Sequence, residues 1–510
     1  MKRRRTIAIA AAAAGLLSAP LAINLQAARA DELSDLRANQ ELLQRRIDQL
    51  AQGIPAPGNP YAGDRAAISG QPSLAGSFPR SFLIPGTETS LRVGGVIREV
   101  ADYWFNGGPP NSSPQTTTVG DNGQLLAVPL HIHPGQPGFS ATSGSARGRG
   151  TSIFSQSPRE SKLNVETRTP TALGEARTVF EFDWGGSTAF APGGANPLSV
   201  SDNLHPRLRF AYGTLGGWLA GQANSNFSDP DGNAETIDFG GNVGEAGVVR
   251  LPQVRYTMPL APWGWLGAIS VSAETPETDG ATVAGQIASD GSPISITPAA
   301  PFFDPFKSPA PDLTVAWYVP QPWGHWDISG VLRPTLQIKD GLSVDRTYTG
   351  WGLHAGFDVK PGWFGWAKDD IIVQGTGGIG IGRYLNCSCQ ISLQSDYPTA
   401  VTPAINPLVH THLVPSFGGE VGYQHWWLPN LRSNFNLGYM HQDLRSQFAG
   451  VPAPGTGTFN KELVSAHANL LWNPVSFVTV GVEYMYGHRI VVNNLKGDEN
   501  VLISKMEVSF

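Results

Sequence analysis

Arginines at alternate positions are the side chains of this sequence best suited to bind a solute. Residues two apart in a β-strand lie on the same face of a sheet, and a guanidinium can donate two parallel hydrogen bonds to a carboxylate. A common inner face, lined to guide anions, is predicted for Arg98, Arg168, Arg177, Arg207, Arg209, Arg250, Arg255, Arg383, Gln222 and Asn224, and Arg92 and Lys162 fall on the same face.

The acids Glu166, Glu181 and Asp183 are predicted to lie on this face too, which leaves two interpretations open. The arginines either form a positive strip for anions or pair with the acids in salt bridges that only stabilise the structure. We favour the strip where Arg207 and Arg209 approach Arg250 and Arg255, with Gln222 and Asn224 on the strand between them, because no acid interrupts that predicted face.

Two pairs of residues in predicted loops could in principle hold a metal. His131 and His133 are two apart, but two ligands do not make a site, so ordinary loop histidines are expected. Cys387 and Cys389 are the only cysteines, and a loop disulfide is favoured over a soft metal. No metal, cofactor or catalytic residue is predicted.

A two-residue alternation predicts the strands that position these side chains. In the segment 175–184, Phe180 and Phe182 alternate with Glu181 and Asp183. Polar inner positions and apolar outer positions are typical of a membrane barrel that encloses water. The same pattern in 207–214 predicts that Leu208, Phe210 and Tyr212 face lipid while Arg207 and Arg209 face inward.

The pattern predicts an all-β transmembrane barrel of sixteen antiparallel strands, with alternating long and short connections as in bacterial outer-membrane barrels. Eleven of the 14 tryptophans lie at or near the short connections, as an interfacial aromatic girdle requires. The predicted strands are 91–105, 161–169, 175–184, 207–214, 217–226, 248–258, 264–274, 311–319, 324–338, 348–360, 370–384, 412–427, 431–442, 461–473, 476–488 and 500–510.

The long connection 227–247 is predicted to fold inward and narrow the lumen, with Asp229 and Glu235 as its acids. The longest connection, 106–160, is predicted to lie at the entrance.

The residues before the barrel predict three segments. Residues 1–30 have the basic start, apolar stretch and A-x-A site of a signal peptide. Residues 31–52 predict a short periplasmic coiled coil, or alternatively a surface helix lying on the barrel. Its a and d positions, which would drive self-association, are Leu33, Leu36, Gln40, Leu43, Ile47 and Leu50. Residues 53–84 predict a linker rich in Pro and Gly, and the barrel is assigned to 85–510.

Composition limits the partners of the chain. The net charge is −6, and it becomes more negative when the basic leader is removed, so nucleic acid is excluded as a partner. After the leader, no apolar run approaches the ~18 residues that a spanning helix needs. The predicted partners are small anionic solutes, outer-membrane lipid and copies of the chain itself.

Several multi-residue blocks occur in an order that resembles the DcaP-like family of outer-membrane porins. These blocks are SFLIPGTETSLRVGG, SKLNVETRTPT, RLRFAYG, WLAGQANSNFSD, ETIDFGG, GIGRYL, YQHWW, AHANLLWNPV and VEYMYG. The resemblance runs from about residue 81 to the C-terminus. It implies a sixteen-stranded barrel, a homotrimer with an N-terminal periplasmic coiled coil, and uptake of small anions such as dicarboxylates.

The sequence therefore predicts an outer-membrane porin that passes small hydrophilic solutes by diffusion and favours anions. Two alternatives stay open at this point. One is an outer-membrane barrel enzyme of the lipase type, for which His441 and Ser446 are close in sequence. The other is an adhesin or scaffold that transports nothing.

Overall fold

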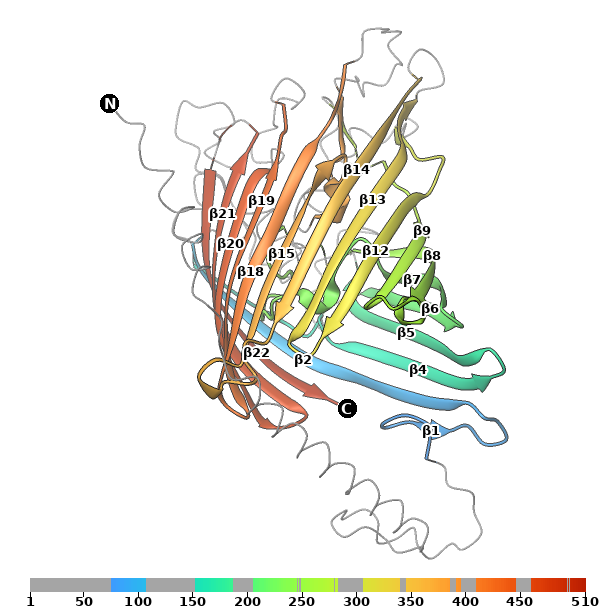
Figure 1. The fold of residues 1–510 in the computed structure, drawn as a ribbon. Helices are drawn as coiled ribbons and strands as arrows, with labels where there is room; N and C mark the ends of the chain where they lie inside the picture. Colours follow the sequence, from blue (N-terminus) through green and yellow to red (C-terminus); the bar gives the residue numbers. More distant parts are fainter. Residues whose placement is uncertain are drawn as a thin grey trace, which may run out of the picture. The chain divides into compact units, whose positions relative to one another are not determined.

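Strands with one apolar and one polar face can close into a barrel that is apolar outside and polar inside. The computed structural model of the chain has this form (Figure 1). It describes residues 75–106, 152–186, 205–244, 246, 249–278, 280–282, 306–339, 345–385, 391–395, 410–445, 460–492, 494 and 496–510. The predicted signal peptide and coiled coil, including Leu33, Leu36, Gln40, Leu43, Ile47 and Leu50, lie outside the described residues, as do His131, His133, Cys387, Cys389 and Ser446.

Sixteen antiparallel strands form the barrel in the described part of the chain, which confirms the predicted number. They are β2 (Ser90–Asn106), β4 (Lys162–Thr171), β5 (Gly174–Gly186), β6 (His205–Leu215), β7 (Trp218–Asn224), β8 (Arg250–Pro259), β9 (Ala268–Glu274), β12 (Asp312–Gln321), β13 (Gly324–Lys339), β14 (Asp345–Val359), β15 (Asp370–Ile379), β18 (Pro415–Leu428), β19 (Leu431–Gln442), β20 (Asn460–Val475), β21 (Val478–Val491) and β22 (Lys496–Ser509).

The first and last strands close the barrel. β2 pairs with β22 from Val96 opposite Ser509 to Asn106 opposite Asn500. At the seam, the amide of Phe510 donates to the carbonyl of Gly95 at 3.1 Å, and the amide of Gly95 donates to the carbonyl of Phe510 at 3.2 Å. Closure leaves these two strands no unpaired edge.

Shorter elements complete the described structure. They are β1 (Phe82–Leu83), β3 (Ile153–Ser157), β10 (Gly280–Thr282), β11 (Phe306–Lys307), β16 (Leu393–Ser395), β17 (Thr411–Leu413), and the 3₁₀ turns η3 (Pro230–Gly232), η4 (Ala261–Trp263), η5 (Trp363–Gly365) and η6 (Gly382–Tyr384). β3, within the predicted entrance loop, pairs with the C-terminal half of β2, from Val100 to Trp104. Among the described residues, no helix is long and apolar enough to cross a membrane.

Residues 75–83, which the sequence assigned to the linker, contact the barrel. β1 pairs with the start of β2. The amide of Ser77 donates to the hydroxyl of Ser90 at 2.8 Å. Phe78 is buried. The last part of the predicted linker is therefore ordered against β2.

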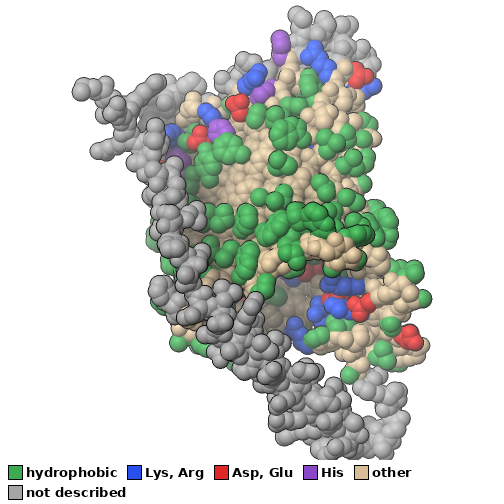
Figure 2. Space-filling model, viewed as in Figure 1, with side chains coloured by type: hydrophobic (Ala, Val, Ile, Leu, Met, Phe, Trp, Pro, Cys, Tyr) green, Lys and Arg blue, Asp and Glu red, His purple; other side chains and the backbone are tan. Residues whose placement is uncertain are grey.

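The outer surface carries the apolar side chains and the interior carries the polar ones. On β5, Phe180 is 46% exposed, whereas Asp183 is fully buried. Figure 2 shows hydrophobic side chains gathered in a band across the face of the barrel in view. Exposed tryptophans such as Trp218, Trp263 and Trp427 lie beside the short turns, so we call this end of the barrel the short-turn end.

Candidate functional site

Cations from five strands lie on one side of the barrel interior, and we call this set the basic wall. Figure 2 shows Lys and Arg side chains together with Asp and Glu over the region of β4 and β5. The basic wall consists of Arg92 and Arg98 on β2, Lys162 and Arg168 on β4, Arg177 on β5, Arg207 and Arg209 on β6, and Arg250 and Arg255 on β8.

Arg207 and Arg209 are paired with two acids of the neighbouring strand. Arg207 donates to both carboxylate oxygens of Asp183, at 3.0 and 2.8 Å. Arg209 donates to Glu181 and to Asp183, each at 2.8 Å. The prediction of an acid-free face was therefore incomplete, because β5 supplies the acids from the side opposite to β8.

A β-bulge in β6 changes which residues face the interior. The register pairs Phe182 with Leu208 and Glu181 with Phe210, which leaves Arg209 with no opposite residue on β5. One extra residue in a strand shifts every following side chain to the other face. The bulge thus lets Arg207, Arg209 and then Phe210 all lie on the inner side.

The residues after the bulge contradict the sequence prediction. Tyr212 lies opposite Val179, which is 6% exposed and belongs to the inner face of β5. The ring of Tyr212 makes an edge-on contact with Phe210, with centroids 6.2 Å apart. The prediction that Phe210 and Tyr212 face lipid was wrong, because a strict alternation contains no bulge.

The bulge also moves Gln222 and Asn224 off the inner face predicted for them. By register, both share a face of β7 with Trp218, which is 56% exposed. Arg250, directly opposite Asn224 at the first residue of β8, starts from the same register face, but its guanidinium reaches to 5.9 Å from the inward-facing ring of Phe210. The amide of Gln222 donates to the backbone carbonyl of Arg209 at 3.1 Å. Asn224 meets the basic wall through its backbone carbonyl, which accepts a 2.5 Å hydrogen bond from Arg255.

Three cations of the basic wall have no carboxylate partner. Among the described residues, no carboxylate oxygen lies within 4.0 Å of Lys162, Arg250 or Arg255. Arg255 donates to the side-chain oxygen of Gln253 at 2.9 Å, and the guanidinium of Arg250 lies 5.9 Å from the ring centre of Phe210. The basic wall therefore carries positive charge that its own acids do not neutralise.

At the short-turn end, three arginines share one acid, and we call this group the lower cluster. Arg92, Arg168 and Arg177 lie 2.6, 2.8 and 2.7 Å from the carboxylate of Glu166. Arg168 also reaches Glu175 at 3.4 Å.

Two predicted site arginines are neutralised in other ways. Arg98 lies 3.1 Å from Glu160 and 2.5 Å from Glu507. Arg383 lies in η6 rather than in the strand predicted over 370–384, and it is buried 3.5 Å from Glu277. Arg383 therefore does not belong to the basic wall.

The connection between β7 and β8 folds into the barrel, and we call residues 225–249 the lumen loop. In Figure 1 this green segment crosses the space that the strands enclose. The backbone amides of Ile237 and Asp238 donate to Glu483 on β21 at 2.7 and 3.1 Å. Asn242 donates to Glu420 on β18 at 2.6 Å. The loop is thus attached to β18 and β21, two strands that carry none of the cations of the basic wall.

Asp229 and Glu235, the predicted acids of the constriction, also contact strands outside the basic wall. Asp229 lies 2.7 Å from His325 on β13. Glu235 accepts two hydrogen bonds from Arg432 on β19, at 2.7 and 2.5 Å. These acids position the loop, and the structure does not place them against the basic wall.

Phe239, in the lumen loop, contacts the basic wall. Its ring centre lies 5.5 Å from the ammonium of Lys162 and 5.5 and 5.3 Å from the guanidiniums of Arg207 and Arg209. The pKa of the neighbouring Asp238 is raised well above its ordinary value by burial and by nearby carboxylates. Phe239 itself presents an uncharged ring to the three cations.

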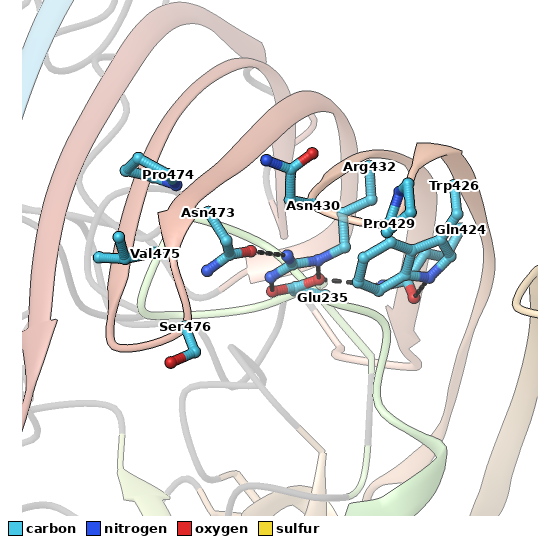
Figure 3. A pocket seen from close by; sticks show the side chains of 10 residues that line it. All are labelled: Glu235, Gln424, Trp426, Pro429, Asn430, Arg432, Asn473, Pro474, Val475 and Ser476. Carbon is cyan, nitrogen blue, oxygen red and sulfur yellow. Dashed lines mark hydrogen bonds and ion pairs between the residues drawn. The ribbon is translucent and has the colours of Figure 1, made fainter. Parts of the chain in front are cut away.

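The pair of Glu235 and Arg432 borders a pocket at the short-turn end, with a volume of ≈ 730 Å³ (Figure 3). Asn473 accepts a 2.6 Å hydrogen bond from Arg432, and the ring centre of Trp426 lies 5.2 Å from the guanidinium of Arg432. The pocket lies between the turns that join β18 to β19 and β20 to β21.

Sequence reasoning missed Phe239, Phe78 and Glu483. An isolated aromatic before the pair Gly240 and Gly241 was the available signal for Phe239. Neither Phe78 nor Glu483 carries a local signal, because their partners are distant in sequence.

The described residues contain no cluster of three or more His, Cys, Asp or Glu arranged to hold a metal ion. His441, one half of the hypothetical enzyme pair, lies 3.5 Å from Glu462.

Known proteins resemble this chain in sequence and in structure. Residues 80–488 match a family model described as a porin subfamily. The outer-membrane channel DcaP of Acinetobacter baumannii is similar in structure, with 22% identity over 84% of this chain and 99% of that chain, and a TM-score of 0.57. An anion-selective porin from Comamonas acidovorans matches with 10% identity over 83% of this chain and 100% of that chain, at a TM-score of 0.41. No protein of curated function matches the chain.

Proposed function

Because the chain belongs to the porin subfamily, we propose that it carries small hydrophilic anions, dicarboxylates among them, by passive diffusion. The chain is an outer-membrane porin, and the family assignment alone leaves the charge of the solute open. The solute charge is the part that the proposal adds. A homotrimer with a periplasmic coiled coil over 31–52 belongs to the same proposal, on the strength of the sequence resemblance to DcaP-like porins.

The observation that carries the proposal is the unneutralised charge of Lys162, Arg250 and Arg255 on the basic wall. The selectivity of a narrow passage follows the local field rather than the net charge of the protein, because low-dielectric walls focus that field. The net charge of −6 therefore does not argue against anion preference. Arginine adds geometry, since its guanidinium can hold a carboxylate with two hydrogen bonds.

The double variant Arg250→Gln/Arg255→Gln tests the proposal. It removes two positive charges without exposing an acid, whereas replacing Arg207 or Arg209 would leave Asp183 partly unpaired. At ~5 Å in water a unit charge is worth about 0.8 kcal/mol, so the anion-to-cation permeability ratio should fall roughly two- to fivefold per charge removed. Reversal potentials across planar bilayers under a KCl gradient measure this ratio.

The control is Lys339→Gln, which removes an exposed cation at the end of β13, where Lys339 pairs with Asp345 at 2.6 Å. This variant should keep the wild-type reversal potential. An unchanged reversal potential in the double variant, or a cation-preferring wild type, would refute the proposal.

A further inference from the structure

The lower cluster has a charge arrangement that its own residues do not balance. Arg168 on β4 lies directly opposite Arg177 on β5, and Arg92 on β2 lies directly opposite Glu166. Like charges directly opposite each other on neighbouring strands are destabilising. Glu166 lies between the two arginines, and Arg168 also reaches Glu175 at 3.4 Å, so two negative charges face three positive charges.

The donors of the lower cluster remain accessible. The side chains of Arg92, Arg168 and Arg177 are 29, 31 and 37% exposed, while Glu166 is only 2% exposed. Each guanidinium has five N–H donors, and Arg177 uses only its Nε–H on Glu166. Donors of three guanidiniums thus remain available on the inner face around a buried carboxylate.

An aromatic ring fixes two of the three guanidiniums. The ring centre of Phe78 lies 4.5 Å from the guanidinium of Arg168 and 5.6 Å from that of Arg92. Phe78 is 7% exposed and belongs to the segment held on β2 by the hydrogen bond from Ser77 to Ser90. Groups held in place before binding lose less entropy when a ligand arrives.

We propose that the lower cluster is a second anion site, which binds a doubly charged oxyanion at the short-turn end of the barrel. It is separate from the cations around Phe239, because none of its three arginines contacts that ring. Conduction through several weak sites is faster than through one strong site, so the lower cluster would receive anions that have passed Phe239. The inference rests on the proposed function, and it adds a defined place where an anion pauses.

Isothermal titration calorimetry of the purified full-length protein tests the inference, with succinate and inorganic phosphate as separate probes. The variant Arg177→Gln removes the most exposed cation and leaves Glu166 paired with Arg92 and Arg168. Because a hydrogen bond between charged groups is lost, binding at this site should weaken about tenfold or more. Arg177→Lys keeps the positive charge but not the planar guanidinium that can donate two parallel hydrogen bonds, so it should weaken binding less.

Further variants and the two probes identify the site and its ligand. Lys339→Gln should bind both probes as the wild type does. Phe78→Leu should weaken binding while keeping every charge, and it replaces Arg177→Gln if that variant does not fold. Binding of succinate alone assigns the site to dicarboxylates, and binding of both probes assigns it to dianions in general; either result supports the inference.

The two proposals fail in different ways. A wild type that shows no anion preference in reversal potentials overturns the proposed function. A wild type that prefers anions, with affinities for both probes unchanged in Arg177→Gln and Phe78→Leu, overturns the second site and leaves the function standing.

Discussion

Individual residues of the lumen loop have two different roles, attachment of the loop and contact with the basic wall, and a sequence pattern cannot distinguish them. The acids Asp229 and Glu235 are committed to His325 and Arg432 and hold the lumen loop in place. Phe239 instead meets three cations of the basic wall. The loop side chain that meets these cations is therefore an uncharged ring, which attracts them through its quadrupole.

Replacing Phe239 should widen the passage beside the basic wall. A phenylalanine buries about 150–250 Å² when packed, so Phe239→Ala should raise the single-channel conductance and expose Lys162, Arg207 and Arg209 to solutes. Phe239→Leu separates the effect of side-chain size from that of cation–π attraction. Leucine should keep most of the narrowing, but without the attraction to the cations the loop should be held less firmly and the open-channel current should be noisier. Single-channel recording measures both effects, and Phe239→Tyr, which retains the ring, serves as the control. Equal conductance in the alanine variant and the wild type would show that the ring does not narrow the path.

At the scale of elements, two features give the interior its form. The bulge at Arg209 turns Phe210 and Tyr212 inward, so that aromatic rings follow the two arginines on the inner face of β6. Glycines on β18 let the lumen loop lie close against it. A Cβ added at Gly422 would lie 2.6 Å from the Cβ of Ala234, so a larger side chain there would push the loop away.

The attachment of the lumen loop depends on Glu483. Its carboxylate accepts hydrogen bonds from the backbone amides of Ile237 and Asp238 and also lies 3.0 Å from His467. Glu483→Ala removes these acceptors, and leaving buried donors unsatisfied costs about 1–3 kcal/mol. We expect faster hydrogen–deuterium exchange in the peptide that contains Ile237 and Asp238, while exchange in the barrel strands stays slow. Glu462→Ala, a change of the same kind on β20, is the control. Unchanged exchange in the loop would mean that its other contacts suffice.

At the scale of the whole molecule, many strands of the barrel can be predicted from local sequence pattern, whereas many contacts inside the lumen cannot. Strand β19 (Leu431–Gln442) was predicted to the residue, because alternation and short turns are local signals. The sequence predicted an inner face for these cations, and their role in guiding solutes stays a prediction. It did not identify their acidic partners, such as Asp183 for Arg207, because a contact between strands is not a local signal. The lumen loop was expected to fold inward, but its partners, such as Glu483 for Ile237, lie 246 residues away.

Anion preference by a basic wall across an aqueous passage should depend on salt. The field of Lys162, Arg250 and Arg255 reaches about 10 Å at 0.1 M salt but only about 3 Å at 1 M. The anion-to-cation permeability ratio should therefore approach unity as KCl is raised over this range at a constant concentration gradient. Reversal potentials measure the ratio, and liposome swelling with an uncharged sugar, which should not change with salt, is the control. A ratio that stays constant would mean that solutes are sorted by direct coordination at short range, because only charges in contact with the ion escape screening.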